Sequence, residues 1–301
     1  MYPAGVCDAD EVTSPGGAGA AREVRFREYR DYEARRIEAS DALMALLAGA
    51  QLASHLLQLN EGSDRLLPEV FPRVPHIGRF NLTSEKARAI LNTADEHLGA
   101  MSVPYALAIH EDFLKTCIGL LETAGLTAAG TADTSKLATQ HGLIETAVGG
   151  TFRAENKQML TTLRRMRNCT IHSGGRANAV LVNGITQWPA SVEQEWIRLA
   201  GRNPRHLRVG DVVRFSHGEL ILSLAITKRL GREANQLLQP ALSHEIWADI
   251  VVADLLADDG GAIRRSEFLR KVHGWARFAY GPLRLTRDEL DAAVTRDRSR
   301  P

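Results

Sequence analysis

One segment of the chain combines residue types that could carry out acid–base chemistry on a phosphate. It spans residues 164–175 and reads RRMRNCTIHSGG. His172 is a candidate proton donor or acceptor because histidine titrates near neutral pH. Arg167 offers a permanently charged planar fork to phosphate oxygens, and the Asn168 amide could orient the phosphate or the imidazole. Together they could move protons at a phosphate ester and stabilise its negative charge.

The spacing of Arg167 and His172 sets a geometric condition on that chemistry. Five positions of an ideal helix turn about 500°, which leaves the two side chains about 140° apart. They could still reach one cleft if the helix end loosens, and Gly174-Gly175 predicts such an end. One pair also lacks a second acid or base, which a symmetric dimer could supply. The alternative is that both residues cap the helix end and pair with an acid.

Residues around this motif are weaker candidates. Arg164, Arg165 and Lys157 could bind the phosphates of a substrate, or could form a solvated helix face. Glu111 is a possible acidic partner for Arg167 or His172, as is its neighbour Asp112. Cys169 lies three residues before His172, so a thiol–imidazole pair is a further alternative. We expect Trp188 and Trp196 to pack in the core rather than stack on bases.

Standard catalytic signatures do not occur in the sequence. It contains no GxxxxGK[ST], GxSxG or HExxH motif, and no CxxC pair. We therefore expect no metal and no cofactor. Three separated cysteines are not a disulfide framework, the first 22 residues have no apolar signal region, and the longest uncharged stretch contains polar residues. These features favour a cytoplasmic protein that does not enter a membrane.

The Arg-Asn-x-x-x-His segment followed by Ser-Gly-Gly resembles the signature of the HEPN superfamily. That signature is an arginine, four to six residues and a histidine, often with a polar residue after the arginine. The resemblance covers about residues 100–240 and implies a helical bundle that often dimerises. Many members are metal-independent endoribonucleases of toxin–antitoxin, abortive-infection and phage-defence systems, and others are inactive scaffolds.

The resemblance predicts a metal-independent endoribonuclease with Arg167, Asn168 and His172 as catalytic residues. In this reaction the 2′-hydroxyl of RNA attacks and a 2′,3′-cyclic phosphate remains. RNA, a second copy of the chain and an antitoxin or regulatory protein are the expected partners. The alternative is a non-catalytic HEPN-like scaffold that binds RNA, a nucleotide or a protein. A third hypothesis, a helical protein–protein adaptor, predicts no affinity for RNA.

The charge distribution agrees with a phosphate-binding segment. The 301 residues are 44% hydrophobic and 24% charged, and their net charge is +1. Residues 151–232, which include the motif, hold 14 basic and 5 acidic residues and so carry +9, whereas residues 1–150 carry −7 from 13 basic and 20 acidic residues. The neutral total therefore does not exclude a polyanionic partner.

Periodicity predicts a mainly α protein, a HEPN-like bundle with a small β-hairpin insertion and extra terminal helices. We expect a flexible arm at 1–22, a helical region with a proline-rich connector at 23–80, the HEPN-like domain at 81–240 and a helical extension at 241–301. Asn183-Gly184 between two β-forming runs predicts the hairpin, and a short strand is expected at 212–215. Pro104 is expected to open a helix that runs to about Ala124.

Overall fold

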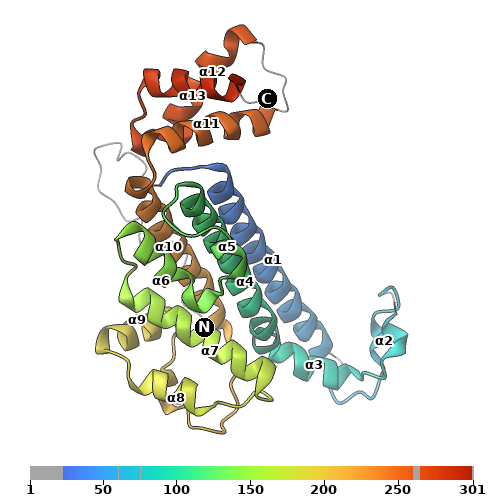
Figure 1. The fold of residues 1–301 in the computed structure, drawn as a ribbon. Helices are drawn as coiled ribbons and strands as arrows, with labels where there is room; N and C mark the ends of the chain where they lie inside the picture. The colour runs from blue at the N-terminus through green and yellow to red at the C-terminus, as the bar shows by residue number, and fades with distance from the viewer. Residues whose placement is uncertain (1–22, 60, 75, 260–264, 300–301) are drawn as a thin grey trace, which may run out of the picture.

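The computed structural model describes residues 23–59, 61–74, 76–259 and 265–299, and this part of the chain is mainly helical. The predicted arm at 1–22 lies outside the described residues. Four long helices form the bundle (Figure 1). They are α1 (Arg27–Gln58), α4 (Ala94–Thr123), α7 (Ala154–His172) and α10 (His217–Ala241).

Shorter helices complete the described chain. These are α2 (Leu67–Val70), η1 (Ile77–Arg79), α3 (Ser84–Asn92), α5 (Thr131–Thr134), α6 (Leu137–Val148), α8 (Ala179–Thr186), α9 (Ala190–Ala200), η2 (Pro204–His206), α11 (His244–Asp259), α12 (Arg265–Ala279), η3 (Gly281–Leu283) and α13 (Arg287–Ser299). The last three α-helices form a lobe at one end of the bundle, and the end of α1 with α2 and α3 forms an arm near the other end (Figure 1).

One hydrophobic core runs through bundle and lobe, because buried side chains from Val24 to Val294 belong to the same cluster. A buried carboxylate links the bundle and the lobe by hydrogen bonds. Asp254 of α11 accepts two hydrogen bonds from Arg30 of α1, both at 2.9 Å, and one from the Tyr280 hydroxyl at 2.6 Å. Asp254 is only 3% exposed, so these hydrogen bonds take the place of water around its carboxylate.

The predicted β-hairpin is wrong. Residues 179–186 form helix α8, and Asn178 caps it by accepting a hydrogen bond from the Leu181 backbone N–H at 3.0 Å. Leu181 and Ile185, four positions apart, are both buried, so packing of one helical face outweighs the local preference for a turn. Asn178, a residue type that favours the N-terminal cap of a helix, is the sequence feature that indicates α8.

Two further expectations need correction. The described residues contain no strand at 212–215, where an isolated bridge joins Val212 to Arg176. Pro104 lies inside α4 rather than at its start, because the helix begins ten residues earlier, at Ala94. An internal proline removes one backbone donor, and the adjacent buried residues Val103 and Ala106 hold this part of α4 in the core.

Candidate functional site

Helix α7 carries the motif, and its buried stripe fixes which side chains face outward. Met159, Leu163 and Met166 recur at a 4-3 spacing and are at most 3% exposed. The helix ends at His172, after which Gly174 and Gly175 adopt left-handed backbone angles with φ of 59° and 75°. The predicted glycine end is therefore present, but α7 stays helical through His172 and loosens only beyond it.

This regular geometry keeps the two main candidates on different sides of α7. Arg167 is half-buried, and its Nη1 donates to the Asn168 side-chain oxygen at 3.2 Å. The Nε of Arg167 is buried without a hydrogen-bond partner in the described part of the chain. His172 is exposed, and among the described residues its imidazole has no hydrogen-bond or ion-pair partner. Arg167 and Asn168 are thus in contact, whereas His172 lies about 140° round the helix from Arg167.

The alternative of a structural pair, in which Arg167 and His172 hold the helix end through an acid, has little support. No described carboxylate forms an ion pair with either side chain. Backbone groups close the helix instead, since the N–H groups of Ser173 and Gly175 both donate to the Cys169 carbonyl, at 3.0 and 3.1 Å.

Three arginines of α7 concentrate positive charge beside the motif. Burial lowers the pKa of Arg164, and the neighbouring charges of Arg165 and Arg167 lower it further. The charge of Glu111 of α4, the predicted acidic partner, acts in the opposite direction and raises the pKa of Arg164. Glu111 forms no ion pair with Arg167 or His172 among the described residues.

Arg165 occupies space that a glycine leaves open. A Cβ built on Gly184 of α8 would lie 1.8 Å from the Arg165 Nη1, so the guanidinium lies directly over the Gly184 backbone. The Asn-Gly pair that predicted a turn thus gives Arg165 room to lie against α8. A glycine inside a helix lowers the stability of that helix, and the close contact with Arg165 gives a structural reason for glycine at position 184.

Lys157 is separate from the motif. Its Nζ forms an ion pair with Glu145 of α6 at 2.6 Å. Ten residues separate it from Arg167, which corresponds to about 15 Å along the helix axis. Several other basic residues of the 151–232 segment are also paired, including Arg202 with Glu219 at 2.6 Å. Within the described chain, the segment's basic residues without an ion pair are of two kinds. Arg164, Arg165 and Arg167 are half-buried beside the motif, and the exposed ones are Arg153, Arg176, Arg208 and Lys228.

Comparison of the chain with models of known protein families, with curated proteins and with solved structures found no match. None of the helices in the described part of the chain is both long and apolar enough to span a bilayer. Within the same residues no three histidine, cysteine or acidic side chains gather as metal ligands would. The assignment of function therefore depends on the chemistry of the site itself.

The remaining sequence candidates are structural. The Cys169 thiol is fully buried whereas His172 is exposed, which separates the two halves of the alternative thiol–imidazole pair. Trp188 and Trp196 are 4% and 0% exposed, and their rings lie 4.9 Å apart, which confirms their predicted place in the core.

Sequence reasoning missed a buried polar chain that crosses the bundle. The Tyr32 hydroxyl donates to the Thr227 carbonyl at 2.6 Å and contacts His110 Nδ1 at 3.0 Å. His110 Nε2 in turn lies 3.2 Å from His141 Nε2. Since Tyr32 has a single proton to give, His110 Nδ1 must donate to it, and His141 must then donate to His110. The only available signal was one polar residue at a buried position in each of three helices.

Proposed function

We propose that the protein is a metal-independent endoribonuclease of the HEPN type. The observation that carries the proposal is the motif end of α7, where a partner-free exposed imidazole ends a helix that carries a cluster of three arginines. His172 would move protons, Arg167 would hold phosphate oxygens and Asn168 would orient Arg167, to which it already bonds. Arg164 and Arg165 would attract the RNA backbone.

The proposed cleavage requires a second proton-transfer group, which a second copy of the chain could supply. General acid–base cleavage of RNA needs one group to deprotonate the 2′-hydroxyl and another to protonate the leaving oxygen. One exposed imidazole supplies only one of these at a time. We therefore propose that the active form is a homodimer whose two His172 side chains share the substrate.

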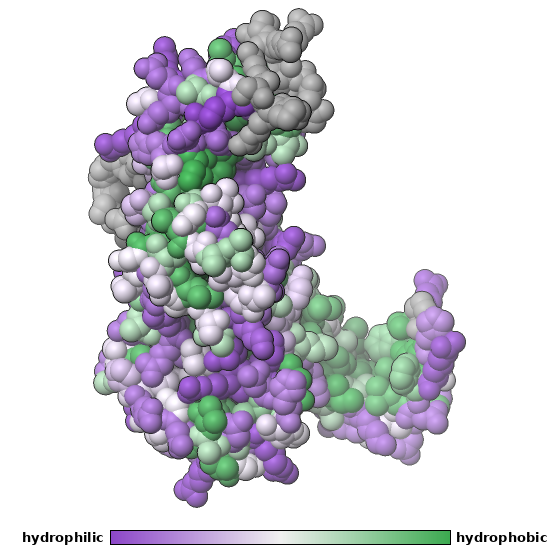
Figure 2. Space-filling view, viewed as in Figure 1, coloured by the Kyte–Doolittle hydropathy of each residue, from purple (hydrophilic) through white to green (hydrophobic). Residues whose placement is uncertain are grey.

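The surface that best suits a second copy is the C-terminal half of α1. Residues 42–59 contain no Asp, Glu, Lys or Arg. Large apolar residues are nevertheless exposed there and on α4, by 42–81%; these are Met44, Leu46, Leu52, Leu56, Leu59, Met101 and Tyr105. Figure 2 shows hydrophobic residues gathered toward the arm where Figure 1 places the end of α1.

The apolar character of this surface fits a dimer. A specific interface takes about 800 Å² per partner, and large exposed apolar patches are uncommon on monomers. A face without charge also carries nothing that repels its own copy.

The cleavage test uses labelled single-stranded RNA in EDTA. We expect wild-type protein to cut it and to leave a 2′,3′-cyclic phosphate, and we expect His172→Ala and Arg167→Ala to lose roughly 10²–10⁴ of the rate. His97→Ala, which removes another exposed histidine, should keep the wild-type rate. Absence of cutting by wild-type protein, or equal cutting by His172→Ala, contradicts the proposal.

The dimer test compares two exposed residues of one helix. Leu52 is 62% exposed in the charge-free half of α1, and Ile37 is 59% exposed in the charged half. We expect Leu52→Glu to halve the mass measured by light scattering and to remove cleavage, while Ile37→Glu leaves both unchanged. A monomeric wild-type protein that cleaves RNA would refute the homodimer.

The proposed place of the enzyme is a defence or toxin–antitoxin system, with an antitoxin or regulatory protein as partner. Uncontrolled RNA cleavage harms the cell that makes the enzyme. We expect induced wild-type protein to arrest growth of a bacterial host, and His172→Ala made at the same level to leave growth unchanged. Equal growth with both proteins would oppose this role.

The second candidate function is an RNA-binding scaffold without catalysis. The observation in its favour is the regular helix through His172, which keeps the imidazole away from Arg167. This function predicts RNA binding that weakens with salt and survives both Arg167→Ala and His172→Ala, with no cleaved product.

A further inference from the structure

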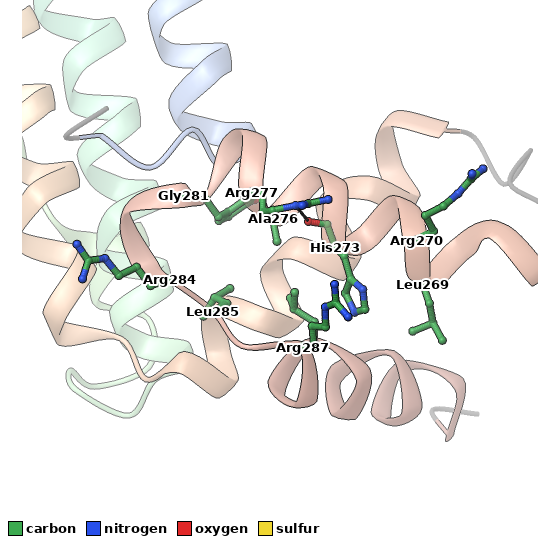
Figure 3. Close-up of a pocket in the computed structure, with 11 residues that line it drawn as sticks. Leu269, Arg270, His273, Ala276, Arg277, Gly281, Arg284, Leu285 and Arg287 are labelled. Atoms are coloured by element: carbon green, nitrogen blue, oxygen red, sulfur yellow. Dashed lines mark hydrogen bonds between the residues drawn. The ribbon is translucent and has the colours of Figure 1, made fainter. Parts of the chain in front are cut away.

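A pocket of about 560 Å³ opens in the C-terminal lobe, between α12, η3 and the start of α13 (Figure 3). It belongs to the part of the chain for which the sequence predicted only helices. Basic side chains line it from three segments; they are Arg270, His273, Arg277, Arg284 and Arg287. All five lie within residues 270–287, and the turn at η3 brings the start of α13 back beside α12 so that they line one pocket.

Most of this positive charge has no acidic partner. Among the described residues, Arg277, Arg284 and Arg287 form no ion pair. The Nε of Arg277 donates only to the His273 carbonyl, at 3.4 Å, as the dashed line in Figure 3 marks. Arg270 lies 3.6 Å from Glu267, so it is partly neutralised. The pocket therefore has a surplus of guanidinium groups.

Two acids of α13 beside the pocket are already engaged. Asp291 of α13 accepts a hydrogen bond from His273 Nε2 at 2.8 Å, which fixes the imidazole between α12 and α13. Glu289 accepts from the Thr286 backbone N–H at 2.7 Å and contacts His244 at 2.9 Å. In Figure 3 the side chains of His273 and Arg287 lie together and Arg277 lies across from them, whereas Arg270 and Arg284 point outward from the rim.

The floor of the pocket is apolar and is formed by buried side chains. Ala276, Tyr280 and Leu290 line it and are at most 6% exposed. The Tyr280 hydroxyl is held by Asp254, so the tyrosine offers the pocket its ring rather than a hydrogen-bonding group. Leu269 and Leu285 extend the apolar lining. A ligand would thus meet guanidinium groups on one side and carbon on the other.

We propose that this pocket binds a small organic phosphate of about the size of a nucleotide. Guanidinium groups recognise phosphate with paired hydrogen bonds, and Arg277 and Arg287 are placed to do so. The apolar floor would receive the flat or carbon-rich part of the ligand. Pockets that hold small molecules measure about 300–1,000 Å³ and combine an apolar lining with a few polar groups, which describes this one.

Calorimetric titration of the full chain tests the proposal directly. The probes are AMP, ATP, a sugar phosphate, inorganic phosphate and adenosine. We expect at least one organic phosphate to bind with a Kd below about 1 mM, at least tenfold more tightly than adenosine or inorganic phosphate. No binding by any organic phosphate to about 1 mM, or equal binding of adenosine, would overturn it.

Variants locate the binding. Arg277→Gln and Arg287→Gln should each weaken the bound phosphate roughly tenfold or more, because each removes a charged hydrogen-bond donor. Arg79→Gln removes an exposed arginine of η1, at the opposite end of the molecule, and should leave the Kd unchanged. Equal affinity of wild-type and Arg277→Gln/Arg287→Gln protein, with both folded by circular dichroism, would place the ligand elsewhere.

A single-stranded RNA oligonucleotide separates a small ligand from a polymer. We expect RNA not to displace the bound small phosphate in the His172→Ala protein. RNA that competes fully, through Arg277 and Arg287, would show an extension of an RNA-binding surface instead and overturn the proposal. Since these titrations measure binding and not cleavage, their result is independent of the proposed nuclease activity.

Discussion

Two groups of histidines in this protein occupy opposite environments. His110 and His141 lie in the core, 0% and 7% exposed, and are joined to each other and to Tyr32 by hydrogen bonds. His172 ends α7 in solvent and has no partner among the described residues. The core pair is part of a buried hydrogen-bonded network, whereas His172 is accessible to solvent.

The difference shows that the environment, not the residue type, assigns the role. Burial lowers the pKa of His110, and the nearby His141 and Arg36 lower it further. Burial, with repulsion from Lys157, lowers the pKa of His141 to about 4. Both core imidazoles are therefore neutral at physiological pH and serve as hydrogen-bond links between α1, α4 and α6. The comparison predicts that core substitutions change stability, whereas changes at His172 alter activity alone.

The largest expected effect is on stability, from His110→Ala. The substitution opens a cavity in the core and removes the links to Tyr32 and His141, so we expect the free energy of unfolding to fall by about 3 kcal/mol. Urea unfolding followed by circular dichroism measures it. A loss below about 0.5 kcal/mol, the range of ordinary surface changes, would mean that the network does not support the fold.

Acidification should destabilise the protein through the same pair. A histidine in the unfolded chain titrates near pH 6.5, but His141 in the folded protein titrates at about 4. Between these values the unfolded state binds protons that the folded state does not, so the free energy of unfolding falls as the pH falls, by at most ~1.4 kcal/mol per pH unit for each histidine.

His141→Gln provides the comparison for this pH dependence. Glutamine keeps a donor toward His110 but does not titrate. Urea unfolding at several pH values between 6.5 and 4 should therefore give a smaller slope for His141→Gln than for wild-type protein. Identical slopes would show that other groups cause the acid sensitivity.

A smaller effect is expected where Arg165 lies over Gly184. A Cβ at Gly184 would meet the guanidinium at 1.8 Å, but that end of a long side chain can move away. We expect Gly184→Ala to change stability by less than about 1 kcal/mol, since the displaced contact is offset by better helix propensity. RNA affinity, measured by fluorescence anisotropy, should change because Arg165 is displaced. Unchanged affinity would exclude Arg165 from the binding surface.

The smallest expected effect on stability is that of His172→Ala. The side chain is exposed and without partners in the described structure, so the free energy of unfolding should stay within about 0.5 kcal/mol of wild type. Thermal and urea unfolding check this. A larger loss would identify His172 as a structural residue and remove the contrast with the core pair.

The sequence predicted the helices well and their tertiary use less well. Gly174-Gly175 correctly predicted where α7 ends, and Met159, Leu163 and Met166 form the buried face of that helix. The hairpin at Asn183-Gly184 was wrong because that pair sits in a helix whose burial is decided by distant packing. Local signals report local conformation, and packing can override them.

Long-range groups could not be predicted. His110 and His141 are 31 residues apart and meet only because α4 and α6 pack together. The arginine pocket of the lobe likewise requires α13 to fold back beside α12. The motif on α7 could be identified from the sequence because its residues are neighbours in the chain. The angle of about 140° between Arg167 and His172 could not, because it depends on α7 staying helical through His172.

The most direct test of the account is RNA cleavage in EDTA by four purified proteins: wild type, His172→Ala, His97→Ala and His141→Gln. The account predicts full cutting by wild-type, His97→Ala and folded His141→Gln protein, with a cyclic phosphate product, and a loss of roughly 10²–10⁴ in rate for His172→Ala at unchanged stability. Equal rates for wild-type and His172→Ala protein would contradict it, because the exposed histidine would then have no part in the chemistry.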